Sequence, residues 1–193
     1  MISYILAVIS AVLLLGADQL TKYSVSTEFA LGEQREFLKG FIDLTYIHNR
    51  GGAWGMLYGK TYILIPITVI VMAVCIILYK KYGKKNKLLF WAIMLVLSGG
   101  VGNMIDRVFR DGNVIDFLHF EFFPSFPVFN VADCAIVVGA GLLIGLFLAL
   151  FVVFDHDFGL SGFIAQVHKQ VQVLGQHACR KAQSLLCLSL IHI

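Results

Sequence analysis

Four long apolar stretches limit what this chain can fold into more than any other feature of its sequence. Residues 2–17, 62–79, 88–105 and 134–154 contain no Asp, Glu, Lys or Arg. With its flanks, each stretch approaches the roughly 20 residues that an α-helix needs to cross the apolar core of a bilayer. Only 14% of the chain is charged, whereas about a quarter is usual in soluble domains. The sequence therefore predicts an all-α integral membrane protein with four transmembrane helices.

Lysines indicate the orientation of these helices. Five of them crowd the short loop between the second and third stretches, where no acid offsets them: Lys80, Lys81, Lys84, Lys85 and Lys87. Cytoplasmic loops carry such an excess of basic residues, so we expect this loop and both termini in the cytoplasm. Residues 22–60 and 106–130 then face outward. The lysines suit contact with anionic lipid headgroups, and nothing in the sequence favours nucleic acid.

Residues 1–155 are interpreted as one membrane domain. The first stretch lacks the basic region and the small-residue cleavage site of a signal peptide, so we expect a retained helix. GFIDLTYIHN (residues 40–49) predicts a small extracytoplasmic β-element of one or two strands in the first outer loop. We assign the tail, residues 156–193, no function. Residues 188–193 match what one reading frame of a common sequencing-adapter end encodes, so we hypothesise that they are not native.

The sequence gives no indication of a metal or another cofactor, and we expect none. Asp116, His119 and Glu121 are close in sequence, but alternation in an extended segment puts His119 on the opposite face from the two acids. The four cysteines have no metal-ligand spacing and are expected to be free thiols: Cys75, Cys134, Cys179 and Cys187.

Polar residues gather at the predicted outer ends of the helices. Asp18 and Lys22 stand one turn apart in DQLTK, where an interfacial ion pair is the simplest interpretation. An acid near a helix C-terminus opposes the helix dipole, however, so Asp18 needs a further reason to be there. In GGVGNMIDR, Asn103, Asp106 and Arg107 share one helix face. Two interpretations explain these three residues equally well. They form either part of a functional site or a polar helix end with an internal Asp–Arg contact.

Glycines mark two places where the backbone comes close to another segment. Gly99 and Gly102 let another helix pack closely against the third helix. In YIHNRGGAWG, Gly51 follows Asn49 in a predicted tight turn, and Trp54 is expected to anchor at the headgroup level.

Two further acids lie near the fourth apolar stretch. Asp116 in NVIDFLHF is surrounded by apolar residues, where a carboxyl group acquires a raised pKa or a partner. In FPVFNVAD, Asn130 is a predicted helix N-cap and Asp133 the third helical residue, where the helix N-terminus favours an acid. The predicted topology places both acids on the outer side of the membrane.

Taken together, the blocks DQLTK, NRGGAWG, GGVGNMIDR, VIDF and FNVAD, in this order within four helices, closely resemble lipoprotein signal peptidase, also called signal peptidase II. The resemblance spans roughly residues 10–155. It implies a bacterial inner-membrane aspartic peptidase that cuts the signal peptide from prolipoproteins just before a diacylglyceryl-modified cysteine. Gly52 and Trp54 replace the more usual alanine and phenylalanine of the second block, which we interpret as changes of loop shape.

The resemblance also implies roles for single residues. The acids of the VIDF and FNVAD motifs, Asp116 and Asp133, correspond to the catalytic pair. Substrate-binding or supporting positions of the family map onto Asp18, Lys22, Asn49, Gly51, Asn103, Asp106, Arg107 and Asn130. The implied partners are the prolipoprotein signal peptide with its diacylglyceryl-cysteine and membrane lipids. We expect a monomer in the cytoplasmic membrane, with its active site near the outer leaflet.

Two close carboxylates suit this chemistry. Peptide hydrolysis without a nucleophilic side chain or a metal needs a base that activates water and an acid that protonates the departing groups. Like charges at short range cannot both ionise, so one carboxyl group stays protonated. We therefore expect Asp116 and Asp133 to share one proton as a coupled pair. Either residue fits the role of the base.

Other classes of protein explain part of the pattern. A small transporter or proton-relay protein also carries acids in the membrane, but the charged candidates here lie at helix ends on one side. A non-catalytic lipoprotein-binding factor would use the same polar rim. A different class of membrane aspartic peptidase carries a glycine-x-glycine-aspartate motif, which is absent from this sequence.

Overall fold

The computed structural model describes residues 2–157 and 168–169. The chain divides into two compact units, Met1–Gly145 and Leu146–Ile193. Most of the predicted tail lies outside the described residues. The hypothesis about residues 188–193 and the expectation of free thiols at Cys179 and Cys187 therefore concern residues that the structure does not describe. The elements follow the order α1 (Ile2–Glu28), β1 (Gln34–Leu38), β2 (Ile42–Asn49), η1 (Ala53–Gly55), α2 (Thr61–Leu78), η2 (Tyr79–Gly83), α3 (Lys87–Phe109), β3 (Val114–Phe120) and α4 (Val131–Asp157).

In the described part of the chain, four helices are long and apolar enough to cross a membrane, as the sequence predicts. Half of the α3 span is buried inside the protein, against 17% or less of each other span, so α3 is the central helix. It packs against α1 and α2. Large apolar side chains point outward from the other helices, which suits a surrounding of lipid tails.

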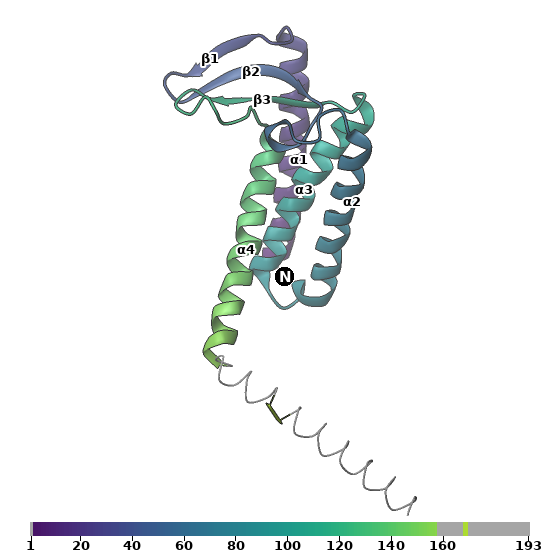
Figure 1. Cartoon of the computed structure of the whole chain (residues 1–193), viewed down its shortest axis with the longest axis vertical. Helices are drawn as coiled ribbons and strands as arrows, with labels where there is room; N and C mark the ends of the chain where they lie inside the picture. Colours follow the sequence, from purple (N-terminus) through teal and green to yellow (C-terminus); the bar gives the residue numbers. More distant parts are fainter. Residues whose placement is uncertain (1, 158–167, 170–193) are drawn as a thin grey trace, which may run out of the picture. The chain divides into compact units, whose positions relative to one another are not determined.

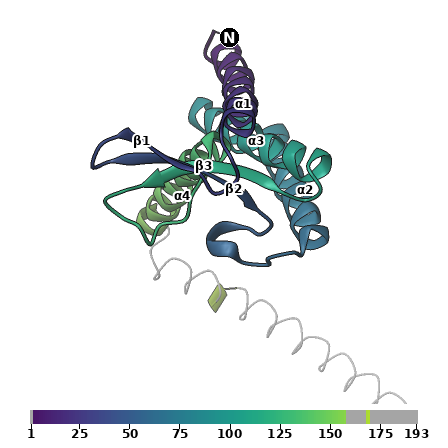
Figure 2. The same ribbon diagram turned by 90° about the horizontal axis from the view of Figure 1, so that it is seen from above.

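A three-stranded antiparallel sheet in the order β1-β2-β3 lies at one end of the helices (Figure 1). Seen from above, it extends across the helix ends (Figure 2). β2 lies within residues 40–49, where the sequence predicts one or two strands, whereas β1 precedes that segment and was not predicted. β3 comes from the segment between α3 and α4 and was not predicted, because its first four residues are buried and the sequence therefore lacks the alternation of a half-buried strand.

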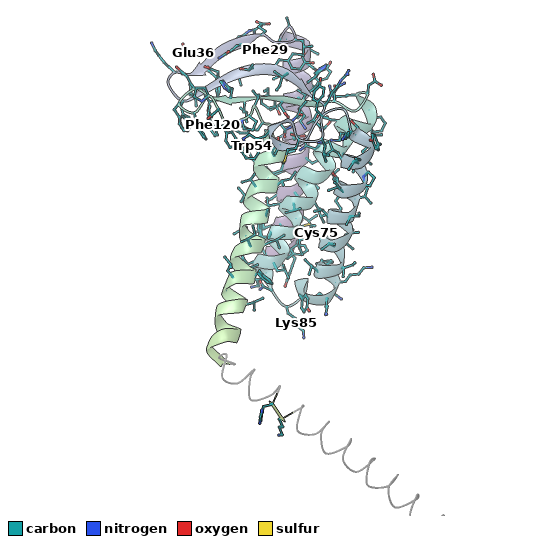
Figure 3. The ribbon with its side chains drawn as sticks, viewed as in Figure 1. Phe29, Glu36, Trp54, Cys75, Lys85 and Phe120 are labelled. Atoms are coloured by element: carbon teal, nitrogen blue, oxygen red, sulfur yellow. The ribbon has the colours of Figure 1, made fainter. Side chains whose placement is uncertain are left out.

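The lysine-rich loop lies at the opposite end of the helices. The Tyr4 hydroxyl donates to the Lys84 carbonyl at 3.0 Å, which places the start of α1 beside this loop. Figure 3 shows Lys85 at the end of the bundle far from the sheet. The start of α1 and the lysine-rich loop are therefore on one side of the bundle, and the sheet is on the other.

Glycines bring α1 and α4 close to α3, as predicted for Gly99 and Gly102. A Cβ atom at Gly99 would collide with the backbone carbonyl oxygen of Ala132 in α4. A Cβ atom at Gly102 would lie 2.7 Å from an Asp18 carboxylate oxygen of α1. Neither position has room for a Cβ atom, so glycine is needed at both for this packing.

The first helix is longer than its apolar stretch indicates. α1 continues to Glu28, so Asp18 and Lys22 lie inside the helix and not at its C-terminus. The prediction of an acid that opposes the helix dipole was therefore wrong. The polar residues after position 17 stay helical because Asp18, Lys22 and Val25 are buried against the rest of the protein.

The glycine contacts predict different outcomes for two neighbouring alanine substitutions. Gly99→Ala should lower the thermal unfolding temperature in detergent, because overpacking costs about 1–3 kcal/mol. Gly100→Ala is the matched control, since its Cβ would meet Met72 at an ordinary 3.6 Å. Equal stability of the two variants would contradict this packing.

Candidate active site

Asp116 lies in the middle of β3 and is almost completely buried, with 1% of its surface exposed. It pairs with Ile47 of β2 in the antiparallel register. The register shifts by one residue between Leu44 and Ile47, next to this pair. Such bulges re-aim side chains beside functional sites, so this irregularity helps to set the direction of the Asp116 side chain.

The segment after β3 folds back and returns the chain to the same place. Phe129 and Leu118 exchange backbone hydrogen bonds, with N–O distances of 2.8 and 2.9 Å. The next residue, Asn130, is fully buried and precedes the first residue of α4. The segment between β3 and α4 therefore brings the start of α4 next to Asp116.

Asn130 and Asp133 cap the start of α4 reciprocally, which confirms the predicted N-cap. The Asp133 backbone N–H donates to Asn130 Oδ1 at 2.9 Å, and the Asn130 backbone N–H donates to Asp133 Oδ2 at 3.3 Å. This arrangement is a capping box with an aspartate in the third helical position. Asn130 Nδ2 also donates to Asp116 Oδ1 at 2.6 Å. One asparagine thus holds both carboxyl groups.

Two more asparagines donate to the pair. Asn49 Nδ2 donates to Asp116 Oδ2 at 2.9 Å, and its own Oδ1 accepts from the Gly51 backbone N–H. Asn103 Nδ2 donates to Asp133 Oδ1 at 2.7 Å. Each carboxyl group therefore receives two hydrogen bonds, and these come from α3, from the start of α4 and from the end of β2.

The environment of Asp116 favours its protonated form. Burial and, to a smaller extent, the negative charge of Asp133 raise the pKa of Asp116 to about 7, although hydrogen bonds from Asn49 and Asn130 oppose this shift. A carboxyl group with this pKa holds its proton at neutral pH in part of the molecules, so it can act as an acid there.

A buried ion cluster lies beside the pair. The fully buried Lys22 ammonium contacts Asp18 at 2.9 Å, Asp106 at 3.0 Å and Asn103 Oδ1 at 3.0 Å. All three ammonium protons therefore have partners. Because the four residues belong to α1 and α3, the cluster joins these helices and fixes Asn103.

Besides Lys22, Asp18 also binds the backbone at the start of α4. Asp18 Oδ1 accepts from the Ala132 backbone N–H at 2.8 Å. A carboxylate at a helix N-terminus satisfies an otherwise unpaired donor and interacts favourably with the helix dipole. Asp18 therefore stabilises α4 at the position from which Asp133 extends.

Asp106 connects α3 to β3. Its Oδ2 accepts from the Ile115 backbone N–H at 3.2 Å, and Arg110 contacts Oδ1 at 3.3 Å. Within the described residues, the ion partners of Asp106 are thus Lys22 and Arg110. The alternative of an Asp–Arg contact inside the helix end is partly correct, although the structure gives the arginine as Arg110 rather than Arg107.

Arg107 instead faces the loop after β2. Its Nη2 donates to the Gly51 carbonyl at 3.2 Å and its Nη1 to the Asn103 carbonyl at 3.4 Å. A side chain on Gly51 would lie 2.9 Å from the Met56 carbonyl oxygen, so the turn predicted here requires glycine. The contact fixes this loop above the pair.

A cavity of about 470 Å³ opens over the two carboxyl groups. Asn49, Asn103, Arg107, Asp116 and Asp133 form its polar part. The remaining wall is apolar, and it is lined by Trp54, Phe120, Phe126, Phe129 and residues 136–138 of α4, among others. Figure 3 shows Trp54 and Phe120 at the end of the bundle that carries the sheet. A cavity of this kind suits an apolar ligand with a polar group at one point.

Some residues of the site had no recognisable signal in the sequence. Gln19 Nε2 donates to Asp18 at 3.0 Å and to the Gly102 carbonyl at 3.2 Å, and only its position between Asp18 and Lys22 could have indicated this role. The apolar lining could not be distinguished from ordinary lipid-facing residues. Within the described residues, no group of three or more His, Cys, Asp or Glu is arranged to hold a metal ion.

Comparison with known proteins agrees with the motifs. The family model described as signal peptidase (SPase) II matches residues 10–149. The chain belongs to the signal peptidase II family. A lipoprotein signal peptidase of Enterococcus faecalis is 46% identical over 66% of this chain and 78% of its own length. One of Bacillus pumilus is 41% identical over 70% and 87%.

Solved structures share the fold of this signal peptidase II family member. A bacterial membrane enzyme structure at 2.3 Å resolution matches with a TM-score of 0.70 and 32% identity, covering 79% of this chain and 90% of the other. A second, at 1.9 Å, matches with a TM-score of 0.68 and 35% identity, covering 74% and 92%. The chain is therefore a multi-pass membrane peptidase.

The hydrogen bond from Asn49 predicts a pH effect. Asn49→Ala removes a donor that favours ionised Asp116, so the pKa of Asp116 should rise above about 7. Activity falls at alkaline pH when Asp116 loses this proton. In Asn49→Ala this alkaline limb of the pH profile should therefore move to higher pH by roughly one unit. The measurement is peptidase activity as a function of pH. His48→Ala is the control, since His48 is adjacent in β2 but contacts Tyr46. An unchanged alkaline limb in Asn49→Ala would be evidence against this role.

Proposed function

We propose that this protein is a membrane-embedded aspartic endopeptidase that removes the signal peptide from diacylglyceryl-modified prolipoproteins, cutting just before the lipid-modified cysteine. The family assignment supports the peptidase activity and the class of substrate. The observation that carries the catalytic assignment is that Asn130 hydrogen-bonds both Asp116 and Asp133 at one cavity. The proposed cleavage needs no cofactor.

In the proposed mechanism, one carboxylate takes a proton from a water molecule as the water attacks the scissile carbonyl carbon. The protonated partner gives its proton to the carbonyl oxygen, which becomes the hydroxyl of a tetrahedral intermediate. Collapse of this intermediate breaks the C–N bond. The hydroxyl formed from the carbonyl returns its proton to the partner carboxylate, and the departing nitrogen takes the proton that the first carboxylate received from water. The raised pKa of Asp116 supports a pair that holds a single proton near neutral pH.

The other predicted residues support the pair in different ways. Asn49, Asn103 and Asn130 donate to the carboxyl groups. Asp18, Lys22 and Asp106 hold the helices that carry them. Arg107 and Gly51 fix the loop over the cavity. In this proposal, none of these residues replaces the pair as acid or base.

The shape of the site fits a substrate that arrives within the membrane. The apolar wall formed partly by α4 suits a signal helix and acyl chains, while the polar part suits the peptide bond. We place the lysine-rich loop and the start of α1 in the cytoplasm and the sheet on the outer side. The active site then lies near the outer leaflet of the cytoplasmic membrane, where a monomer would suffice.

The transporter and binding-factor alternatives are not favoured by the family assignment. A binding factor would retain its ligand after loss of either acid and would release no product. A cleavage assay therefore separates the enzyme from both alternatives.

The decisive substitutions are Asp116→Asn and Asp133→Asn. Each should lower cleavage of a diacylated prolipoprotein peptide by at least about 10²-fold, because general acid–base catalysis contributes a factor of this order or more. Release of the signal peptide by the purified protein is the measurement. Thermal unfolding should show that both variants remain folded.

Asp111→Asn is the matched control for the same chemical change. Asp111 is exposed and has φ 52°, a conformation that asparagine tolerates. Its substitution should leave cleavage unchanged. Near-normal turnover by either Asp116→Asn or Asp133→Asn would show that the two residues are not the catalytic pair.

A further inference from the structure

Lys22 does not line the cavity, yet two hydrogen bonds connect it to one of the two carboxyl groups. Its ammonium is fully buried and donates to Asn103 Oδ1 at 3.0 Å. Asn103 Nδ2 then donates to Asp133 Oδ1 at 2.7 Å. A cation is thus linked through one amide to the aspartate of α4.

The ammonium determines which way this amide points. The two ends of an asparagine amide have similar size, so their partners decide the orientation. An ammonium has donors only and therefore accepts only the oxygen end as a neighbour. Asn130 Nδ2 donates to the same oxygen at 3.1 Å. With the oxygen of Asn103 held there, its NH₂ group must face Asp133.

Asp116 lacks such a connection. Its donors are the amides of Asn49 and Asn130. The oxygen ends of these amides accept from the backbone N–H groups of Gly51 and Asp133, which are neutral. The two carboxyl groups therefore differ. Asp133 accepts a hydrogen bond from Asn103, whose oxygen binds the Lys22 ammonium. Among the described residues, no amide connects Asp116 to a cation in this way.

We propose that Lys22 is a positioning residue that, through the amide of Asn103, keeps Asp133 as the ionised member of the pair and so leaves the proton on Asp116. This inference rests on the proposed peptidase function and assigns the roles within it. Asp133 is then the base that takes the proton from water. Asp116 is the acid that protonates the carbonyl oxygen.

The other charged groups near Asp133 do not replace this connection. The carboxylates of Asp18 and Asp106 balance the ammonium, so the effect operates mainly through the fixed amide and less through a net positive charge. The raised pKa of Asp116 agrees with a proton on that residue. Among the described residues, the titratable and charged groups that interact with Asp133 from the surrounding elements are Asp18 and Lys22 of α1, Arg107 of α3, Asp116 of β3 and the neighbouring Cys134.

The test measures kcat/KM against pH for full-length Lys22→Met and Lys22→Gln with a diacylated prolipoprotein peptide. Losing a donor that fixes the amide should make Asp133 harder to ionise, so the acid limb of the profile should move to higher pH by about one unit. At the optimum, kcat should fall roughly tenfold, which corresponds to one charged hydrogen bond. KM should stay nearly constant, since Lys22 does not reach the cavity.

Lys39→Met is the matched control, because Lys39 is exposed in the turn between β1 and β2. Its profile should equal that of the wild type. Lys22→Met with reduced activity but an acid limb at the wild-type pH would overturn the proposal, because a purely structural role predicts that result.

Asn103→Asp tests the same connection even if the Lys22 variants do not fold. The new carboxylate keeps an oxygen toward the Lys22 ammonium but offers Asp133 no donor. Cleavage should then fall and the acid limb should move by more than about one unit. A wild-type profile for Asn103→Asp would overturn the proposal.

Failure of this inference is distinguishable from failure of the proposed function. Suppose that Asp116→Asn and Asp133→Asn are inactive but the acid limb of Lys22→Met stays at the wild-type pH. This result would leave the aspartic mechanism in place and overturn only the role of Lys22. Active aspartate variants would overturn both.

Discussion

The buried ammonium of Lys22 holds together the part of the protein on which the site depends. It binds carboxylates from α1 and α3, and those carboxylates in turn accept backbone N–H groups at the start of α4 and in β3. An unpaired charge in this place would be very costly, so the cluster exists only when these elements are assembled. The packing of these helices and the geometry of the site therefore depend on the same contacts.

The side chains that donate directly to the carboxyl pair are asparagines. Asparagine supplies donors to each carboxyl group without adding charge, so burial and mutual repulsion still favour a shared proton. Asn130 is central because it caps α4 and binds Asp116 and Asp133 together. The apolar wall of the cavity strengthens the effect, because it makes the surroundings of the carboxyl groups less polar and suits a substrate that comes from the bilayer.

Much of this arrangement was predictable from the sequence. Charge-free stretches indicate the helices, and ordered motifs indicate the residues that meet at one end. Other features depend on contacts between distant segments. α1 is longer than its apolar stretch because Lys22 is buried by its partners, and β3 carries no alternating pattern because both of its faces are covered. The partner of Asp18 is a backbone group of Ala132, which no side-chain motif could indicate.

The central claim is that Asp116 and Asp133 form one coupled pair with a single shared proton near neutral pH. The most direct measurement is a carbon-13 NMR titration of the Asp116 carboxyl group in the detergent-solubilised protein, assigned with Asp116→Asn. A coupled pair should give a midpoint near 7 for this group and a lower midpoint in Asp133→Asn, where the like charge is absent. A midpoint near the ordinary aspartate value of about 4, or one that Asp133→Asn does not move, would contradict it.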